Sequence, residues 1–358
     1  MPKPLITANQ VTFLRLALLP IGSWMLYQGE PGQWAALVFM TLVGCTDFVD
    51  GWLARKYGPT VLGSLMDPIA DKVFVAVTYL PVVDLGWIPW YVVAALFMRE
   101  FIVTAARTAY ERRHVSLKTS YLAKVKTWFQ MCGIGLIFML RTIPGPNLER
   151  EWIMNVVFGA IFAGPVLFGL IHYAVKREVW RGSVVWFFCW GAFLAVQLVF
   201  GSRGTIHVAA WATLAITYAS GGAYLVGMRE LPGTGRIDAH DVVRLFGAAA
   251  LPILSCALIA WHVAGWAIVA TVALEFGVGG LDNLLTHKDR IPSWAGWAAR
   301  TVPQVALLGT ALYLVRSGPA VHGQVYALIV AAFAISLVST AILFWRNRDA
   351  YLADLEKG

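Results

Sequence analysis

Long apolar runs follow one another along almost the whole chain, separated by short polar stretches. An apolar run of about 20 residues can cross a bilayer as a helix, and the pattern predicts about twelve such helices. They cover residues 10–28, 33–54, 65–84, 88–110, 120–141, 153–175, 183–201, 205–228, 241–262, 264–284, 298–315 and 322–345. We therefore predict an all-α, polytopic membrane protein with six helices in residues 1–180 and an additional six-helix region in residues 181–358.

Composition agrees with this prediction. Hydrophobic residues make up 59% of the 358 residues and charged residues only 13%, whereas soluble domains have about 25% charged residues. The 16 Trp residues fit the enrichment of Trp at membrane interfaces. The first apolar run, residues 11–27, has no clear small-residue cleavage site, so we expect a retained helix and not a signal peptide.

Basic residues gather in every second loop. Because such loops stay in the cytoplasm, we predict a multi-pass protein of the cell (inner) membrane with both termini cytoplasmic. The net charge of +8 then serves orientation and contact with anionic lipid headgroups, and we expect no nucleic-acid partner. The loops concerned contain Arg55-Lys56, Arg112-Arg113, Lys176-Arg177, Arg229 with Arg236, Lys288 with Arg290, and Arg346 with Arg348.

Two stretches of the chain match each other in sequence, and an internal repeat is the first of two explanations. At a constant offset of 232, residues 19–21 match 251–253, and Asp50 matches Asp282. Residues 241–345 would then be a degenerate copy of the first four helices. The alternative is that apolar helices resemble one another by chance. In the second copy, three acids are replaced: Asp47 falls on Gly279 and, after one inserted residue, Asp67 falls on Arg300 and Asp71 on Gln304.

Four acidic residues stand out in the first half. Asp47 and Asp50 are three residues apart, and Asp67 and Asp71 are four apart, so each pair shares one face of a helix. Two neighbouring helices would bring the four together near their cytoplasmic ends. Clustered carboxylates repel one another, and ionisable groups in membranes are costly and usually functional. A bound divalent cation would relieve both costs.

The chemistry of these carboxylate ligands limits which metal ions are expected. Carboxylate oxygens favour Mg²⁺, Mn²⁺ or Ca²⁺, and a pair of such ions suits transfer at phosphorus. Gly51 and Ala54 leave a small-residue surface for a phosphorylated ligand, and Arg55 offers a fork for a diphosphate. The alternative is that the acids pair with nearby basic residues of a solvated helix end, namely Arg55, Lys56 and Lys72.

The stretch from Asp47 to Asp71 reads D-x-x-D-G-x-x-A-R, a spacer, then G-x-x-x-D-x-x-x-D. It resembles the signature of the CDP-alcohol phosphotransferase (CDP-alcohol phosphatidyltransferase) family, and only the spacer is one residue shorter than usual. The resemblance implies Mg²⁺ or Mn²⁺, with two ions in the site, bound by Asp47, Asp50, Asp67 and Asp71. It also implies that Asp71 is the general base and that Gly51, Ala54, Arg55 and Gly63 lie around the CDP group.

Basic residues near the cytoplasmic helix ends bear on the acceptor. Arg107, Lys124 and Lys126 would suit a phosphate-bearing alcohol, or they would only anchor the helices at the membrane surface. The Arg99-Glu100 pair, the spacing to Arg107 and the run K-x-K-T-x-x-Q resemble phosphatidylglycerophosphate synthases. That implies phospholipid synthesis from CDP-diacylglycerol and glycerol 3-phosphate with release of CMP. Cardiolipin synthases, which use a lipid alcohol, have a similar motif.

Two alternatives concern the whole chain. Repeats and intramembrane charges are also typical of transporters, although acids at one membrane face favour an enzyme.

The resemblance makes residues 1–180 a CDP-alcohol phosphotransferase domain. We expect either a homodimer or an intrachain pseudo-dimer, in which residues 181–358 replace a second subunit; an unrelated module is the other option. Glu275, Asp282 and His287 are expected to be structural or vestigial.

Overall fold

The structure is a computed structural model that describes residues 7–58, 61–112, 121–145, 149–179, 181–229, 239–288, 290 and 293–349. This part of the chain contains eleven α-helices and two short 3-10 helices, and no strand, so the all-α prediction is confirmed. The α-helices are α1 (Ala8–Met25), α2 (Gly29–Tyr57), α3 (Val61–Asp84), α4 (Trp90–Glu111), α5 (Tyr121–Thr142), α6 (Glu151–Lys176), α7 (Arg181–Arg229), α8 (Ala239–Ile259), α9 (Gly265–His287), α10 (Trp294–Leu314) and α11 (His322–Arg346). The short 3-10 helices, η1 (Val315–Ser317) and η2 (Pro319–Val321), connect α10 to α11.

The observed helices follow the apolar pattern closely. Ten predicted helices each correspond to one observed helix, and the remaining two, 183–201 and 205–228, are both part of α7. Among the described residues, seven helices are long and apolar enough to cross a membrane, namely α2 and α6 to α11. The chain is therefore a polytopic membrane protein, while the number of about twelve spans stays a prediction. Helices α3, α4 and α5, which are not among these seven, carry charged residues of the site described below.

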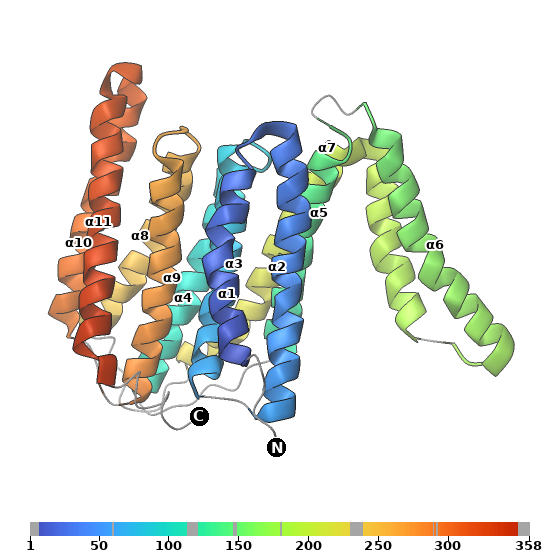
Figure 1. Cartoon of the computed structure of the whole chain (residues 1–358), viewed down its shortest axis with the longest axis horizontal. Coiled ribbons are helices and arrows are strands. Elements are labelled where there is room, and N and C mark those ends of the chain that lie inside the picture. The colour runs from blue at the N-terminus through green and yellow to red at the C-terminus, as the bar shows by residue number, and fades with distance from the viewer. Residues whose placement is uncertain are drawn as a thin grey trace.

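The helices stand side by side in one bundle, as Figure 1 shows. α1 packs on α2 and α3, while α3 and α4 pack along α9 and α8 of the second half. α10 and α11 lie beyond α8 and α9. The beginning of α1 and the end of α11 lie at the same end of the bundle, which is the arrangement that an even number of crossings requires.

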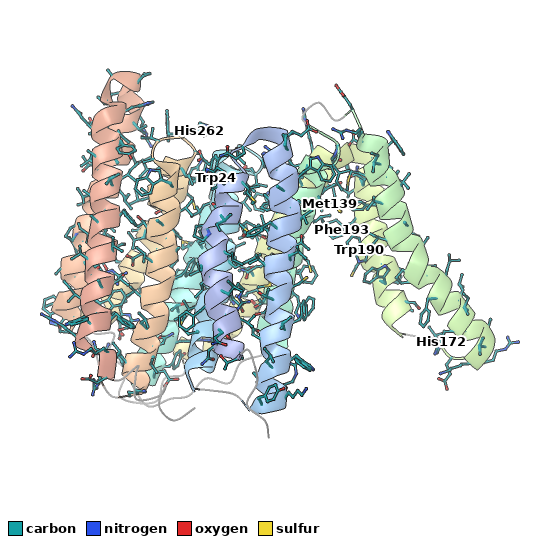
Figure 2. All side chains as sticks on the ribbon, in the orientation of Figure 1. Trp24, Met139, His172, Trp190, Phe193 and His262 are labelled. Atoms are coloured by element: carbon teal, nitrogen blue, oxygen red, sulfur yellow. The ribbon has the colours of Figure 1, made fainter. Side chains whose placement is uncertain are left out.

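One pair of helices leaves the bundle. α6 and the first part of α7 form a hairpin that leans away from the other helices, and α7 then turns back along α5 and α4 (Figure 1). The turn is at Gly201, whose φ of 66° and ψ of −171° belong to a region that glycine alone occupies readily. Figure 2 shows Met139 of α5 with Phe193 and Trp190 of α7 where the hairpin joins the bundle.

The two halves of the chain share one apolar core. Phe276 of α9 stacks on Phe101 at 4.1 Å between ring centroids, and Phe97 meets the same ring edge-on at 5.7 Å. Gly280 of α9 lies so close to Ile69 that a Cβ at this position would overlap the Ile69 side chain. Small residues commonly allow such close helix packing in membranes, and here they bring α9 against the helix that carries Asp67 and Asp71.

Polar contacts also join the halves at both ends of the bundle. At one end, the Asp84 carboxylate accepts a hydrogen bond from the Tyr27 hydroxyl at 2.8 Å and lies 2.7 Å from Nδ1 of His262, which is labelled in Figure 2. At the other end, Arg244 donates to the Thr108 hydroxyl at 2.8 Å. These contacts support a second half that is a fixed part of the molecule.

The acids of the second half are buried and paired. Arg244 forms an ion pair with Asp282, and Arg300 forms one with Glu275. Because buried carboxylates without a partner are strongly destabilising, these pairs support the structural role expected for Glu275 and Asp282. The side chain of His287, expected to have the same role, lies outside the described residues.

Candidate active site

The four predicted acids come together from α2 and α3 at two residues of α1, Arg15 and Thr12. Arg15, whose side chain is 1% exposed, lies among them. Its Nη1 is 2.5 Å from Oδ1 of Asp47 and 3.6 Å from Oδ1 of Asp71, and its Nη2 is 3.5 Å from Oδ2 of Asp50. The predicted clustering of the acids is therefore present in the fold, around a guanidinium.

Thr12, one turn before Arg15 on α1, links the two acidic helices. Its Oγ1 lies 3.2 Å from Oδ2 of Asp50 and 3.2 Å from Oδ1 of Asp67. Neither Thr12 nor Arg15 was predicted as a site residue. The available signal was the position of Arg15 inside an apolar helix, because an isolated cation at such a place requires a buried partner.

The alternative explanation for the four acids, in which they pair with nearby basic residues of the helix ends, is wrong. No described acid of the cluster forms an ion pair with Arg55, Lys56 or Lys72; the ion pairs of the cluster are made with Arg15. Lys72 instead donates to the Thr104 hydroxyl at 2.7 Å.

The cluster has the donor chemistry of a divalent-cation site. All four side chains offer carboxylate oxygens, and three of them already lie around one positive group. Oδ1 of Asp71 is buried and accepts no hydrogen bond, which leaves it available to a cation. With the Arg15 guanidinium among them, no three acidic, His or Cys side chains in the described ranges are arranged to hold one metal ion. In this structure the Arg15 guanidinium is the positive group that lies among Asp47, Asp50 and Asp71.

Three of the four residues expected around CDP, namely Gly51, Ala54 and Arg55, follow Asp50 on α2. Gly51 is half-buried, and a Cβ added there would meet only Nη1 of Arg55, at 3.5 Å. Ala54 is half-buried and Arg55 is exposed. Gly63, near the beginning of α3, is buried. The small-residue surface next to the acids is therefore accessible from outside the bundle, as a nucleotide site requires.

A cavity of about 310 Å³ adjoins the acid cluster and is also lined by basic residues, which we call the basic wall. Asp67 and Asp71 line the cavity, and so do Lys72, Arg107 and Lys126 of the basic wall. The structure therefore brings together two of the three basic residues predicted to bind a phosphorylated acceptor. The side chain of the third, Lys124, lies outside the described residues.

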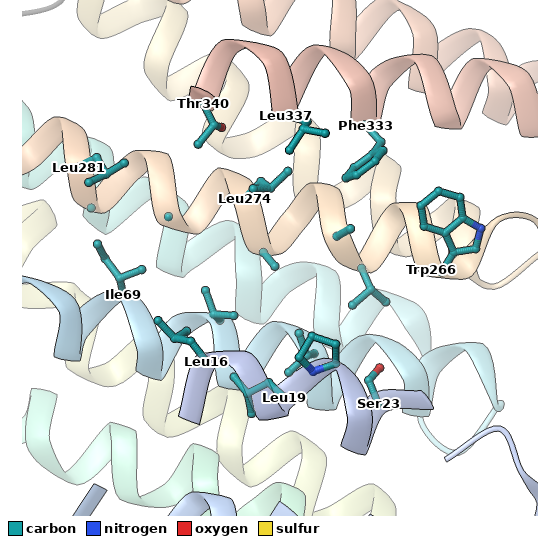
Figure 3. A pocket seen from close by; sticks show the side chains of 18 of the residues that line it. Leu16, Leu19, Ser23, Ile69, Trp266, Leu274, Leu281, Phe333, Leu337 and Thr340 are labelled. Carbon is teal, nitrogen blue, oxygen red and sulfur yellow. The ribbon is translucent and has the colours of Figure 1, made fainter. Parts of the chain in front are cut away.

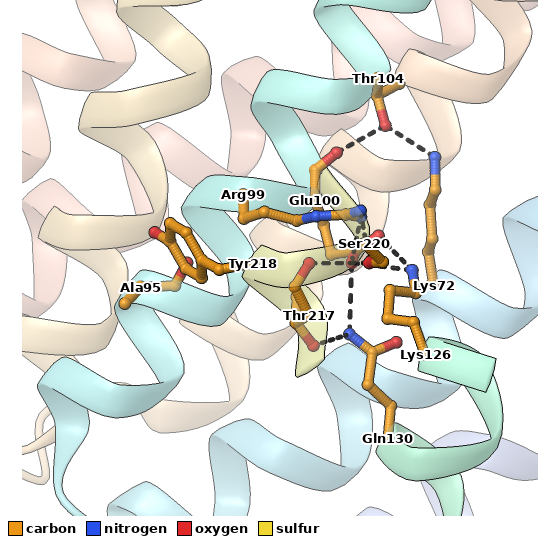
Figure 4. Close-up of polar contacts among 10 residues, drawn as sticks. All are labelled: Lys72, Ala95, Arg99, Glu100, Thr104, Lys126, Gln130, Thr217, Tyr218 and Ser220. Carbon is orange, nitrogen blue, oxygen red and sulfur yellow. Dashed lines mark hydrogen bonds and ion pairs between the residues drawn. The ribbon is translucent and has the colours of Figure 1, made fainter. Parts of the chain in front are cut away.

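Glu100 organises the basic wall, as Figure 4 shows. Its carboxylate accepts hydrogen bonds from Lys126 at 2.8 and 2.9 Å, from Arg99 at 3.0 Å and from Gln130 at 3.2 Å. Glu100 thus offsets only part of the positive charge on this wall, which also includes Lys72. A compact anion such as a phosphate monoester is the ligand that this excess of cations favours.

An apolar groove of about 900 Å³ runs past the acid cluster between α1 and α3 on one side and α9 and α11 on the other. Figure 3 shows it from Ile69 and Leu281 at one end to Trp266 at the other. Leu16, next to Arg15, also lines it. A groove lined by apolar side chains across the bundle suits an acyl chain.

Comparison with known proteins identifies the first half. A family model for CDP-alcohol phosphatidyltransferase matches residues 5–162. A protein of Mycobacterium tuberculosis named "Probable phosphatidylglycerophosphate synthase" is 38% identical over 137 residues, which are 37% of this chain and 65% of that protein. The chain thus spans somewhat less than two thirds of that relative.

Two further relatives carry the name CDP-diacylglycerol--glycerol-3-phosphate 3-phosphatidyltransferase. The protein of Rickettsia bellii is 35% identical over 137 residues, 37% of this chain and 74% of that protein. The protein of Bacillus subtilis is 29% identical over 152 residues, 38% of this chain and 77% of that protein. No solved structure matches the chain. With the intact acidic motif and these relatives, the chain belongs to the CDP-alcohol phosphatidyltransferase family.

Proposed function

We propose that the chain transfers a phosphatidyl group from CDP-diacylglycerol to glycerol 3-phosphate and releases CMP. The observation that carries this proposal is the shared cavity, which Asp67 and Asp71 line together with Lys72, Arg107 and Lys126. The cations would hold the phosphate of the acceptor, and its free hydroxyl would point to the acids. The printed names of the Rickettsia and Bacillus relatives describe the same reaction.

The residues suggest a direct displacement at phosphorus. The Asp71 carboxylate accepts the proton of the acceptor hydroxyl. The hydroxyl oxygen forms a bond to the phosphorus of the phosphatidyl group, and the bond from that phosphorus to the oxygen of CMP breaks. CMP leaves with the electron pair of that bond. Asp71 then returns the proton to solvent or to the leaving phosphate.

The four acids would hold Mg²⁺ or Mn²⁺, as two ions, at the donor diphosphate. When bound, the metal supplies positive charge that offsets the negative charge on the diphosphate and on the leaving CMP. Three of these acids, Asp47, Asp50 and Asp71, form ion pairs with the Arg15 guanidinium in the described structure, which supports a site for a cation. Gly51, Ala54, Arg55 and Gly63 would contact CDP, and the apolar groove of Figure 3 would take acyl chains of the donor.

The second half would replace a partner subunit. α8 and α9 cover α3 and α4 in this chain, so these helix faces are not available to a second copy. We expect an intrachain pseudo-dimer that is monomeric in solution, as a catalytic domain of residues 1–180 with a degenerate copy in 241–345 implies. The protein would lie in the cell (inner) membrane, with its termini and active site on the cytoplasmic side.

The decisive experiment is an assay of the purified protein. It contains CDP-diacylglycerol, Mg²⁺ or Mn²⁺, and in turn glycerol 3-phosphate, glycerol or phosphatidylglycerol as acceptor. We expect CMP and phosphatidylglycerophosphate with glycerol 3-phosphate, and no CMP without metal. CMP release with phosphatidylglycerol alone would show a cardiolipin synthase instead. No CMP with any acceptor would contradict a transferase.

A further inference from the structure

The acceptor pocket is supported from behind by residues of a helix that the family match does not cover. The match ends at residue 162, but α7 returns to the bundle after Gly201 and reaches the basic wall. In Figure 4, Thr217 and Ser220 of α7 lie beside Arg99 and Gln130. Both α7 hydroxyls are fully buried, so this contact is part of the interior of the protein.

Ser220 is oriented as a hydrogen-bond acceptor for Arg99. Its hydroxyl donates to the backbone oxygen of Thr217 at 2.8 Å, and its oxygen accepts from Nη2 of Arg99 at 2.8 Å. The other arm of the guanidinium, Nη1, donates to Glu100 at 3.0 Å. Because the guanidinium is a planar fork, these two contacts determine where it lies.

Gly221 provides the space for that guanidinium. A Cβ at Gly221 would lie 2.8 Å from Nε and 3.3 Å from Nη2 of Arg99. Any other residue at this position therefore displaces Arg99. At the next position, Gly222, an added Cβ would have no atom within 4 Å. The two glycines are adjacent on one helix, and only the first is required by the site.

The position of Arg99 affects the rest of the pocket through Glu100. Arg99 and Lys126 donate to the same carboxylate. An ammonium group has three donors, and two of the Lys126 contacts are to Glu100. If Arg99 moved, Glu100 and Lys126 would have to rearrange, and the spacing of the cations around the cavity would change.

We propose that α7 positions the basic wall. Ser220 and Gly221 hold Arg99 in place, so that Glu100 keeps Arg99 and Lys126 at the spacing that a phosphate monoester requires. This inference rests on the proposed function and adds a part of the chain to it. Ser220 and Gly221 are positioning residues, since neither lines the cavity. Recognition of the acceptor thus depends on a helix beyond the matched domain.

The test compares Gly221→Ala with Gly222→Ala. Both changes raise helix propensity alike, but only the first displaces Arg99. For Gly221→Ala, we expect KM for glycerol 3-phosphate to rise about tenfold, with KM for CDP-diacylglycerol unchanged. Gly222→Ala should keep both values. Equal KM values for glycerol 3-phosphate in the two variants would overturn the proposal. So would a Gly221→Ala variant in which KM for CDP-diacylglycerol rises as much as KM for glycerol 3-phosphate.

Ser220 provides a second, independent measurement. Ser220→Ala should raise KM for glycerol 3-phosphate, and Ser220→Thr, which keeps the hydroxyl, should restore it. Failure of Ser220→Thr to restore it, with an unchanged melting temperature, would count against a positioning role. Calorimetric binding of glycerol 3-phosphate to wild type and Gly221→Ala separates this proposal from the reaction itself. If the wild type has no transferase activity but binds glycerol 3-phosphate more tightly than Gly221→Ala does, only the proposed reaction is contradicted. If the two proteins bind glycerol 3-phosphate equally, the role of α7 is contradicted.

Discussion

At the scale of single residues, the candidate site is a group of carboxylates held together by one guanidinium. The acidic motif was readable from spacing alone, because residues three or four apart share a helix face. Arg15 was not, since its partners are more than 30 positions away and belong to other helices. The same holds for Glu100, whose partners Lys126 and Gln130 come from a different helix.

We expect Arg15→Gln to make the protein dependent on metal for stability. Without the guanidinium, four carboxylates repel one another, so the metal-free melting temperature should fall. Added Mn²⁺ should then raise the melting temperature more than it does in wild type, because no side chain competes for the acids. Lys56→Gln removes an exposed positive charge on α2 and is the control. An equal effect of Mn²⁺ on wild type and Arg15→Gln would contradict competition between Arg15 and metal.

Asp71→Asn tests the assignment of the base. The amide cannot accept the acceptor proton, so CMP release should fall by about 10²- to 10⁴-fold, while the melting temperature changes little. The measurement is CMP release at saturating CDP-diacylglycerol and glycerol 3-phosphate. If the rate of the variant stays within a few-fold of wild type, Asp71 is not the base.

At the scale of elements, α7 contains a break that the apolar pattern indicates. The pattern predicts two helices, 183–201 and 205–228, and the structure has two helical segments that meet at Gly201, where the backbone is not helical. Glu151, at the beginning of α6, accepts from the backbone N–H of Ser202 at 2.5 Å, so α6 caps the second part of α7. Sequence indicated where the break falls, but the direction of the chain after it depends on this contact.

Gly201→Ala should destabilise the junction between the hairpin and the bundle. The backbone at this position has a φ of 66°, and a Cβ would overlap the Glu151 carboxylate. We expect a loss of about 1–3 kcal/mol from the backbone conformation alone, seen as a lower melting temperature. Gly159→Ala, on α6 with open space around it, is the control and should not lower the melting temperature. A stability of Gly201→Ala equal to that of the control would show that the turn carries no strain.

At the scale of the whole molecule, the two halves form one unit. The internal repeat predicted from sequence stays a prediction, but the two matched acids, Asp50 and Asp282, are each paired with an arginine of another helix. Asp282, which matches Asp50, pairs with Arg244, as Asp50 pairs with Arg15. In the first half, one guanidinium pairs with three acids. In the second half, Asp282 and Glu275 each pair with a guanidinium of their own.

Arg244→Met should be strongly destabilising, because it leaves Asp282 buried without its cation. Removing one member of a buried ion pair costs about 3–5 kcal/mol. The double variant Arg244→Met with Asp282→Leu removes both charges and should recover most of that loss. The measurement is the melting temperature of each variant in the same detergent. A double variant as unstable as the single one would show that the pair does more than neutralise charge.

We expect the purified chain to be a monomer, since α8 and α9 cover the faces of α3 and α4. Light scattering with correction for bound detergent, or native mass spectrometry, measures this directly. A stable dimer would contradict an intrachain pseudo-dimer and would require another surface for the contact.

The sequence by itself determined the helices, the membrane character and the acidic motif. Each depends on local information, namely the length of apolar runs and the spacing of residues along one helix. Only the tertiary structure decided that Arg15 lies among the acids, that Glu100 organises the basic wall and that Ser220 of α7 reaches Arg99. These contacts join residues up to 121 positions apart, and helix packing, not periodicity, determines which side chains meet.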